Sequence, residues 1–176
     1  MAWGITLLYP LLVYLGLGQF EPRWIALCLL AVALSRAIMS RDPVWLAAAA
    51  GAMLLAMLSI LGNHSLPLKL YPVLVSTVML AVFGLSLLHP PSAIERIARI
   101  TDPELPPEAI AYTRKVTGVW CVFFVANGGI ALATALWATD RIWALYNGLI
   151  AYLLMGVLFL GEWLIRQRHR ARGQRG

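Results

Sequence analysis

The sequence predicts an all-α fold, a polytopic transmembrane helix bundle of about six spans with a short cytoplasmic interfacial helix between the fourth and fifth. Two observations lead to this fold class. Hydrophobic residues make up 61% of the 176-residue chain and charged residues only 12%, whereas soluble domains carry roughly a quarter charged residues. Apolar runs of about 17–25 residues, the length that crosses a hydrocarbon core, recur along the chain.

Short segments rich in proline, glycine and charge separate the apolar runs, and such segments are typical turn signals. These breaks place the spans near residues 4–20, 24–40, 44–61, 70–88, 117–138 and 142–165. The runs leave no room for a separate soluble domain. We therefore expect a single transmembrane domain, residues 1–165, followed by a basic cytoplasmic tail, residues 166–176.

The basic residues predict the orientation, because Lys and Arg are enriched in cytoplasmic loops. If both termini are cytoplasmic, eleven of the fourteen basic residues fall on the inner side of the membrane. The three on the outer side are Arg23, Lys69 and Arg141. We expect a multi-pass protein of a bacterial inner membrane with both termini in the cytoplasm.

The N-terminal run and the cysteines carry no processing or cofactor signal. The first span has neither a basic start nor a small-residue cleavage site, so a signal peptide is not expected. Cys28 and Cys121 lie in separate apolar runs and are expected to be buried hydrophobes. No three histidines or carboxylates have the spacing of a metal site, and no cofactor is expected.

The longest polar segment, His89–Lys115, predicts two helices separated by prolines. Ser92 and Glu95 have the spacing of a capping box. The helical period then gathers apolar residues on one side and charged residues on the other: Ile94, Ile97, Ala98 and Ile100 against Glu95, Arg96 and Arg99. This pattern predicts a short helix in the cytoplasmic interface. Pro107 is suited to start a second helix, which we expect to continue through Glu108 and Lys115 into the fifth span.

Ionisable and amide side chains inside spans are costly and define a possible polar membrane site. Arg36 and Glu162 lie about one turn from the cytoplasmic ends of the second and sixth spans. Either they pair, if those spans are adjacent, or each reaches the interface independently. Asn127 and Asn147 are each followed by glycine. Either they join helices through hydrogen bonds, or they line, with Tyr146, a small cavity for a lipid headgroup or another substrate.

Small residues at four-residue spacing predict where helices approach closely in lipid. They are Ala48, Ala52 and Ala56 in the third span, and Gly129 and Ala133 in the fifth. The triplet Leu-Tyr-Pro also opens both the first and the fourth span. It raises the alternative of an inverted repeat of two three-helix units, although Tyr and Pro are common near helix starts in any case.

Catalytic motifs are not recognisable in the sequence. It contains no nucleophile elbow, HExxH helix, phosphate-binding loop or paired carboxylates within a span. The sequence therefore leans away from an enzyme, and Trp120, Phe123 and Phe124 are expected to be packing or interface residues. The net charge of +6 does not predict nucleic-acid binding, because the basic tail follows a span directly and is better explained by orientation and anionic lipid.

From His64 onward the order of features resembles intracellular septation protein A, a family of small bacterial inner-membrane proteins. The shared pattern is an outer loop with histidine, a charged connector, an aromatic span and a final span ending in basic residues. Its positions here are His64, Lys69, Pro72, Leu105-Pro106, Trp120, Phe123-Phe124, Gly128, Thr139-Asp140 and Trp143. The resemblance implies a multispan protein without known catalytic residues that acts in envelope integrity and division.

A second resemblance rests on a shorter phrase at the start of the fifth span. Its residues are Tyr112, Arg114-Lys115, Trp120-Cys121, Phe123-Phe124 and Asn127-Gly128. The phrase is similar to uncharacterised membrane proteins associated with aryl polyene and fatty-acid-like pigment pathways. It implies a role in making or exporting a membrane-bound acyl product.

Three functions follow from these observations and resemblances. The first is a non-enzymatic, septation-like role in cell-envelope maintenance through contacts with lipids or other inner-membrane proteins. The second is a small transporter or lipid flippase built on the inverted repeat. The third is an accessory subunit of aryl polyene or fatty-acid-like synthesis, in which an acidic acyl carrier protein docks on the connector. The docking residues would be Arg96, Arg99, Arg114 and Lys115.

Overall fold

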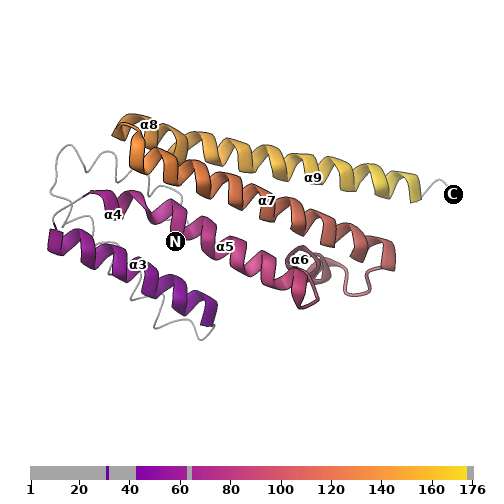
Figure 1. The fold of residues 1–176 in the computed structure, drawn as a ribbon. Helices are drawn as coiled ribbons and strands as arrows, with labels where there is room; N and C mark the ends of the chain where they lie inside the picture. Colours follow the sequence, from indigo (N-terminus) through magenta and orange to yellow (C-terminus); the bar gives the residue numbers. More distant parts are fainter. Residues whose placement is uncertain (1–30, 32–42, 63–64, 174–176) are drawn as a thin grey trace.

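A computed structural model describes residues 43–62 and 65–173, together with the single residue Ala31. These residues form helices and short connections, without a strand in the described ranges, which confirms the all-α class. The long helices α3 (Pro43–Gly62), α5 (Tyr71–Leu88), α7 (Pro107–Trp137) and α9 (Ala151–Gly173) lie side by side in chain order (Figure 1). The first two predicted spans, 4–20 and 24–40, lie outside the described residues.

The shorter elements lie at the two ends of this row. One end, the α8 end, holds α4 (Leu66–Lys69) and α8 (Asp140–Leu145), which passes through a π-helical turn, η1 (Tyr146–Ile150), into α9. The opposite end, the α6 end, holds α6 (Ala93–Thr101), which connects α5 to α7. Both names are kept below.

Three described helices are long and apolar enough to cross a membrane: Leu66–Leu88, Pro107–Trp137 and Asp140–Ile165. They correspond to the fourth, fifth and sixth predicted spans. The third predicted span, 44–61, corresponds to α3. Its apolar part, Ala49–Gly62, is shorter than the three helices of spanning length. The described chain therefore supports a helical membrane protein with three helices of spanning length.

The segment before α5 is more helical than predicted. Residues up to Lys69 were expected to form a turn, but Leu66–Lys69 is a helical turn that leads through Leu70 into α5. Pro67 lies in the first turn of α4, where its fixed φ suits a helix start and its missing N–H is no loss. The turn predicted for residues 66–69 is therefore wrong.

The helix α7 confirms the predicted extension of the fifth span. It begins at Pro107 after the extended Pro106 and carries Glu108 in its first turn. Its 31 residues give a length of about 46 Å at 1.5 Å per residue, which exceeds a hydrocarbon core of roughly 30 Å. The segment from Pro107 to Lys115 is therefore a helical stalk beyond the apolar part.

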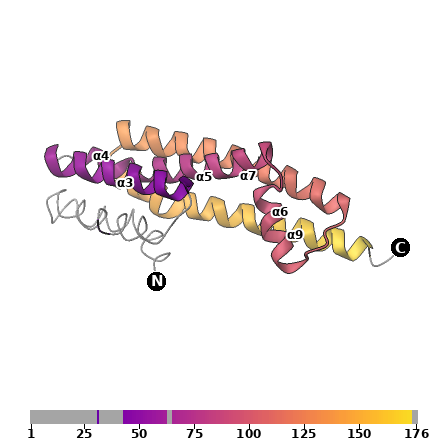
Figure 2. The same cartoon turned by 90° about the horizontal axis from the view of Figure 1, so that it is seen from below.

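The helix α6 lies crosswise to the long helices, as Figure 2 shows. The predicted capping box of Ser92 and Glu95 is present, and the Ser92 N–H donates to Glu95 Oε2 at 3.3 Å. The predicted placement of Glu95 on the charged, solvent-facing side is wrong, because Glu95 is buried. The residues that α6 buries are Ala93, Ile94, Glu95 and Ala98, whereas Ile97 and Ile100 are 59% and 83% exposed. The difference arises because Glu95 is neutralised by Arg99 and so can be buried.

Small residues contribute to the buried faces of α3 and α7. Ala52 and Ala56 of the predicted stripe are buried, and Ala49 joins them, whereas the Ala48 side chain lies outside the described residues. On α7 the prediction of Gly129 is wrong, because Gly129 is exposed and its neighbour Gly128 is buried. The buried stripe of α7 is Gly128, Ala131 and Ala135.

The last helical stretch begins at a capped turn and extends further than the predicted span. Thr139 is the N-cap of α8, and its hydroxyl accepts a 3.4 Å hydrogen bond from the Ile142 N–H. The stretch then continues through η1 to Gly173. The first part of the predicted tail, residues 166–173, is therefore helical.

Candidate functional site

The possible polar membrane site lies where η1 faces α7 and α5 near the α8 end. A π-helical turn holds one more residue than an α-helical turn and is frequently found at functional sites. In η1 the consecutive residues Tyr146 and Asn147 are both buried. Each donates a hydrogen bond to a side chain of α7, so the turn directs two polar groups at one neighbour.

A chain of hydrogen bonds links η1, α7 and α5 through Asn127. The Tyr146 hydroxyl donates to Asn127 Oδ1 at 3.1 Å, and Asn127 Nδ2 donates to Ser76 Oγ of α5 at 3.1 Å. We call Tyr146, Asn127 and Ser76 the polar chain. It fits the expectation that Asn-Gly within a span marks an interhelical hydrogen bond.

Asn147 makes a second connection closer to the α8 end. Its Nδ2 donates to the Trp143 carbonyl at 2.9 Å and to Thr134 Oγ1 of α7 at 3.3 Å. Because a carbonyl only accepts, these bonds fix the amide with its nitrogen toward Trp143. Asn147 is 4% exposed, and its Oδ1 has no hydrogen-bond partner within the described part of the chain.

Trp143 ties this region to the α4 turn. Its fully buried ring packs with Ala56, Leu68 and Ala135, and its Nε1 donates to the Lys69 carbonyl at 3.1 Å. The Lys69 ammonium also pairs with the Asp140 carboxylate at the start of α8. The α8 end is therefore held by an apolar cluster, an indole hydrogen bond and an ion pair.

The structure brings together Asn127, Asn147 and Tyr146 of the five residues predicted for this site. Glu162 lies elsewhere, on α9 beyond η1, and is partly exposed. Arg36 lies outside the described residues, so its predicted pairing with Glu162 stays a prediction. Sequence reasoning missed Ser76 and Thr134. Hydroxyl side chains inside otherwise apolar runs were the available signal.

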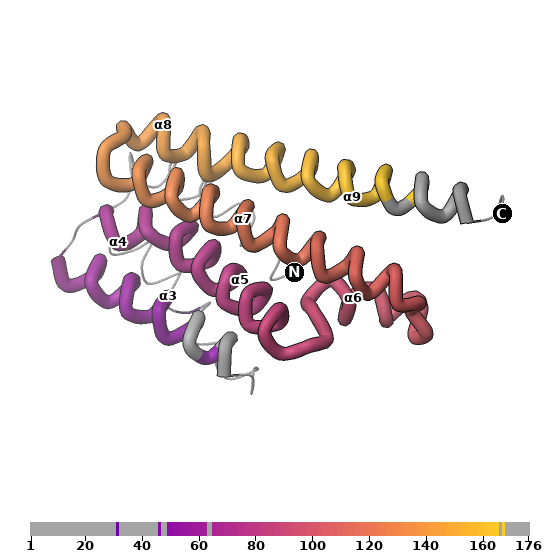
Figure 3. Tube along the Cα trace, turned by 45° about the vertical axis from the view of Figure 1, so that its right-hand side comes forward, coloured from indigo at the N-terminus to yellow at the C-terminus, as the bar shows by residue number. Residues whose placement is uncertain are grey.

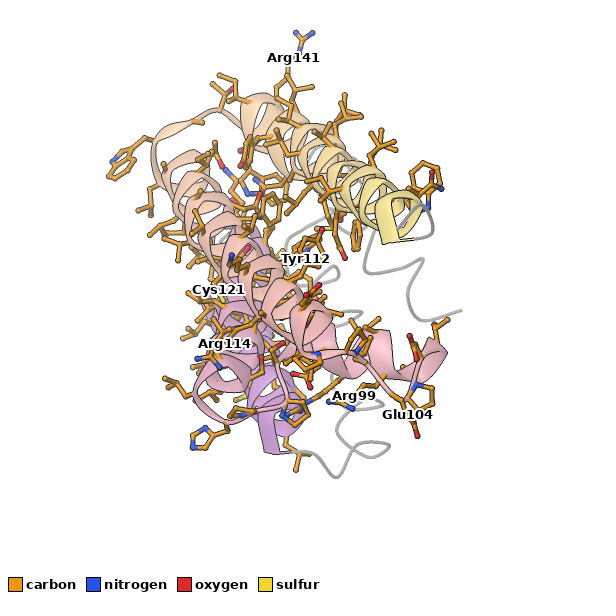
Figure 4. The ribbon with its side chains drawn as sticks, turned by 90° about the vertical axis from the view of Figure 1, so that its right-hand side faces the viewer. Arg99, Glu104, Tyr112, Arg114, Cys121 and Arg141 are labelled. Atoms are coloured by element: carbon orange, nitrogen blue, oxygen red, sulfur yellow. The ribbon has the colours of Figure 1, made fainter. Side chains whose placement is uncertain are left out.

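The predicted docking residues lie at the α6 end, opposite Arg141 (Figure 4). Arg99 is engaged internally: its Nε and Nη2 donate to Glu95 Oε1 at 3.0 and 2.8 Å, and its Nη1 donates to the Pro103 carbonyl at 3.0 Å. Arg96 is exposed, and its Nε donates to the Pro91 carbonyl at 3.0 Å. Arg114 and Lys115 are exposed on α7. Figure 4 shows Arg114 well separated from Arg99, so the basic side chains do not form one compact cluster.

Within the described residues, no group of three or more histidine, cysteine or acidic side chains is placed to hold a metal ion. Comparison of the chain with protein-family models, with curated proteins and with solved structures finds no match in any of the three. The fold and the site define an all-helical protein with three described helices that could span a membrane and with hydrogen-bonded side chains between its helices.

Proposed function

We propose that this chain is a non-enzymatic, multi-pass protein of a bacterial inner membrane that maintains the cell envelope through contacts of its α6 end with lipids or other inner-membrane proteins. In this proposal it has six spans, and both termini are cytoplasmic. The observation that carries the proposal is the crosswise helix α6, which is held firmly on one side and leaves Ile97 and Ile100 uncovered on the other.

The firm attachment of α6 rests on bonds to both neighbouring helices. The Ala93 N–H donates to Ser86 Oγ of α5 at 2.8 Å, and the Ile94 N–H donates to Thr117 Oγ1 of α7 at 3.3 Å. These bonds satisfy N–H groups that have no partner within the helix, because they belong to its first turn. Ile94 also packs with Phe83 and Trp120. A helix fixed in this way presents a constant surface for a membrane or a partner.

The polar chain is better explained by a role in joining helices than by a role in lining a transport cavity. The side chains of Ser76, Asn127 and Tyr146 form hydrogen bonds with one another. In lipid such bonds contribute to helix association, because the alternative for each group is poor solvation. A substrate path would instead be expected to leave several of these groups for the substrate.

A complementation experiment tests the role of the α6 end. In a deletion strain, the wild-type gene should restore resistance to osmotic and envelope stress, whereas the Ile97→Ser, Ile100→Ser variant should not, at equal protein level. The matched control replaces two exposed apolar residues of the opposite end, Ile142→Ser and Leu145→Ser. The proposal fails if the deletion changes no envelope phenotype, or if both double variants complement equally.

Single cysteines at the two ends of the bundle test the orientation. Arg141 and Glu104 are exposed and lie at opposite ends in Figure 4. A membrane-impermeant thiol reagent should label Arg141→Cys in intact cells and Glu104→Cys only after the membrane is opened. The reverse pattern would place the α6 end outside and would overturn the cytoplasmic assignment.

The exposed basic residues favour a second candidate, docking of an acidic acyl carrier protein for polyene or fatty-acid-like synthesis. Arg96, Arg114 and Lys115 all present their side chains to solvent at the α6 end. Complementary charge accelerates and orients such encounters. Replacing the three by Ala should abolish carrier binding to the purified protein, whereas Arg141→Ala should not. Unchanged binding by the triple variant would remove this candidate.

A further inference from the structure

Trp120 of α7 lies where α5, α6, α7 and α9 meet. Its side chain is 3% exposed, and aromatic rings surround it. The ring centroids of Phe83, Phe123, Phe124 and Phe159 lie 6.2, 5.7, 5.7 and 4.6 Å from that of Trp120. The indole Nε1 has no hydrogen-bond acceptor within the described part of the chain. A buried donor without an acceptor is unusual, because it has lost its solvation without gaining a partner.

One wall of this ring cluster is loosely held. In the apolar part of Asp140–Ile165 only 6% is buried inside the protein, whereas in the apolar part of Pro107–Trp137 the buried share is 22%. The part of α9 that reaches the cluster consists of Met155, Leu158 and Phe159. Phe159 is itself about half exposed although it touches Trp120. On the α9 side, the described residues that cover the cluster are therefore a few partly exposed side chains.

The π-helical turn gives α9 a place to bend. Sharp changes of helix direction occur at such turns, and η1 lies directly before α9. The turn is anchored to α7 through Tyr146 and Asn147. Beyond it α9 diverges from α7, as the tube in Figure 3 shows. A swing of α9 about η1 would open the cluster sideways without breaking the anchored turn.

We propose that the ring-lined contact between α7 and α9 is a binding site for the acyl chain and carbonyl group of a membrane lipid, which enters from the bilayer as α9 swings outward. The apolar walls suit an acyl chain. The Trp120 N–H suits an uncharged acceptor oxygen such as an ester carbonyl. Phe159 covers the site in its closed form, which is the form described above.

Binding would favour the open form for a definite reason. A ligand shifts an equilibrium only by its difference in affinity for the two forms. In the closed form the Trp120 N–H is buried without an acceptor. In the open form the lipid carbonyl accepts that hydrogen bond, so the bond is gained only on binding. The proposal concerns the purified protein and a lipid, and it does not depend on an envelope role of α6.

The test compares two ligands and two variants of the full-length protein in detergent micelles. The probes are a brominated fatty acid methyl ester and a brominated alkane of the same length; bromine quenches tryptophan fluorescence, so both report saturable binding. The ester should bind the wild type about tenfold more tightly than the alkane, the worth of one hydrogen bond. Trp120→Phe keeps an aromatic ring and removes the N–H, so binding of the two probes should become equal.

Trp137→Phe is the matched control, because Trp137 lies on the same helix but is 81% exposed at the α8 end. It should keep the tenfold preference. With seven tryptophans in the chain, binding by the Trp120→Phe variant can still be followed by the quenching of the others and by the thermal shift that each probe produces. Equal binding of ester and alkane to the wild type would overturn the proposal, and would also be the outcome if water already satisfies the indole.

A second variant keeps the test decisive if Trp120→Phe does not fold. Phe159→Ala removes the ring that closes the site from α9. It should bind the ester more tightly than the wild type does, because less of the closed form has to be displaced. Weaker or unchanged binding by Phe159→Ala would show that Phe159 does not cover the site.

Discussion

The two neighbours of α7 contact it in different ways. Toward α5 the contact is close around Ser76: the small residues Ser76 and Gly128 face each other there, and the hydrogen bond between Asn127 and Ser76 crosses it. Toward α9 the contact is filled by large rings, with Trp120 against Phe159 at 4.6 Å, and the helices separate beyond η1 (Figure 3). We call these the close interface and the ring interface.

The difference has a physical origin in the solvent. Lipid is as apolar as the side chains, so burying apolar surface between helices adds little in a membrane, and close packing and hydrogen bonds decide which helices stay together. The close interface has both. The ring interface has neither a hydrogen bond at Trp120 nor a closely approached backbone, so lipid can replace α9 there at low cost.

Enlarging Gly128 is expected to have the largest effect, because it acts at a tight approach between α7 and α5. A Cβ at Gly128 would lie 3.1 Å from Ser76 Cβ, whereas a Cβ at Gly129 would meet nothing within 4 Å. Gly128→Leu should therefore lower the free energy of unfolding by about 1–3 kcal/mol, the usual cost of overpacking. Reversible unfolding in mixed micelles measures it.

The matched control for this change is Gly129→Leu, which adds the same side chain one residue along the same helix. It should leave the free energy of unfolding nearly unchanged. If the two variants were equally destabilised, the cost would come from leucine in α7 itself and not from the approach of α5. The distinction between a close and a replaceable interface would then lose its basis.

Removing the polar chain should have the next largest effect. A double-mutant cycle with Ser76→Ala and Asn127→Leu isolates the bond between the two side chains, which are 3.1 Å apart. Its coupling energy should be about 0.6 kcal/mol and at most roughly 1.7 kcal/mol, the range found for such bonds in lipid. Tyr146→Phe should show coupling to Asn127 but not to Thr134, since Thr134 is bonded to Asn147. Coupling near zero in the first pair would mean that lipid or water replaces the bond freely.

The ring interface should respond less than either of these. Phe159→Ala removes one ring contact from a side chain that is already about half exposed. Aromatic pairs contribute about 0.5–1.5 kcal/mol to stability. Because Phe159 is half exposed, its replacement should lower the free energy of unfolding by only about 0.5 kcal/mol. The same unfolding measurement tests this value. A loss as large as that of Gly128→Leu would show that α9 is held as firmly as α5.

Among the described residues, long apolar runs and proline breaks predicted the long helices α3, α5 and α7 to within a few residues, but neither the α4 turn nor the C-terminal end of α9. Interhelical hydrogen bonding was one of the two roles that the sequence allowed for Asn127 and Asn147, and the structure contains such bonds. The sequence did not predict that Glu95 is buried. That depends on Arg99 one turn later folding back onto it, and periodicity alone assigns both residues to the solvent side.

Other features depended on geometry that the sequence does not specify. Gly128 and Gly129 are chemically identical, and only the rotation of α7 decides which of them faces Ser76. The π-helical turn likewise has no clear sequence signature, although Asn147-Gly148 lies inside it. The burial of the Trp120 indole among four rings depends on Phe83 and Phe159, which lie far from it in sequence, as well as on Phe123 and Phe124, which lie near it. These features depend on how the helices pack in the tertiary structure, so the sequence alone does not predict them.

The ion pair of Lys69 and Asp140 should have the smallest effect. It joins α4 to α8 next to the Trp143 hydrogen bond, at the end where the close interface and the ring interface are tied together. Asp140 is about half exposed, so solvent screens the pair, and Asp140→Asn should cost only about 0.2–0.5 kcal/mol. The cost should disappear in 1 M salt, where the screening length is about 3 Å. A loss that persists in high salt would instead assign the effect of Asp140 to the start of α8, where its charge favours the helix N-terminus. The α8 end would then be held by Trp143 and its cluster, with the ion pair contributing only to the local order of the α4 turn.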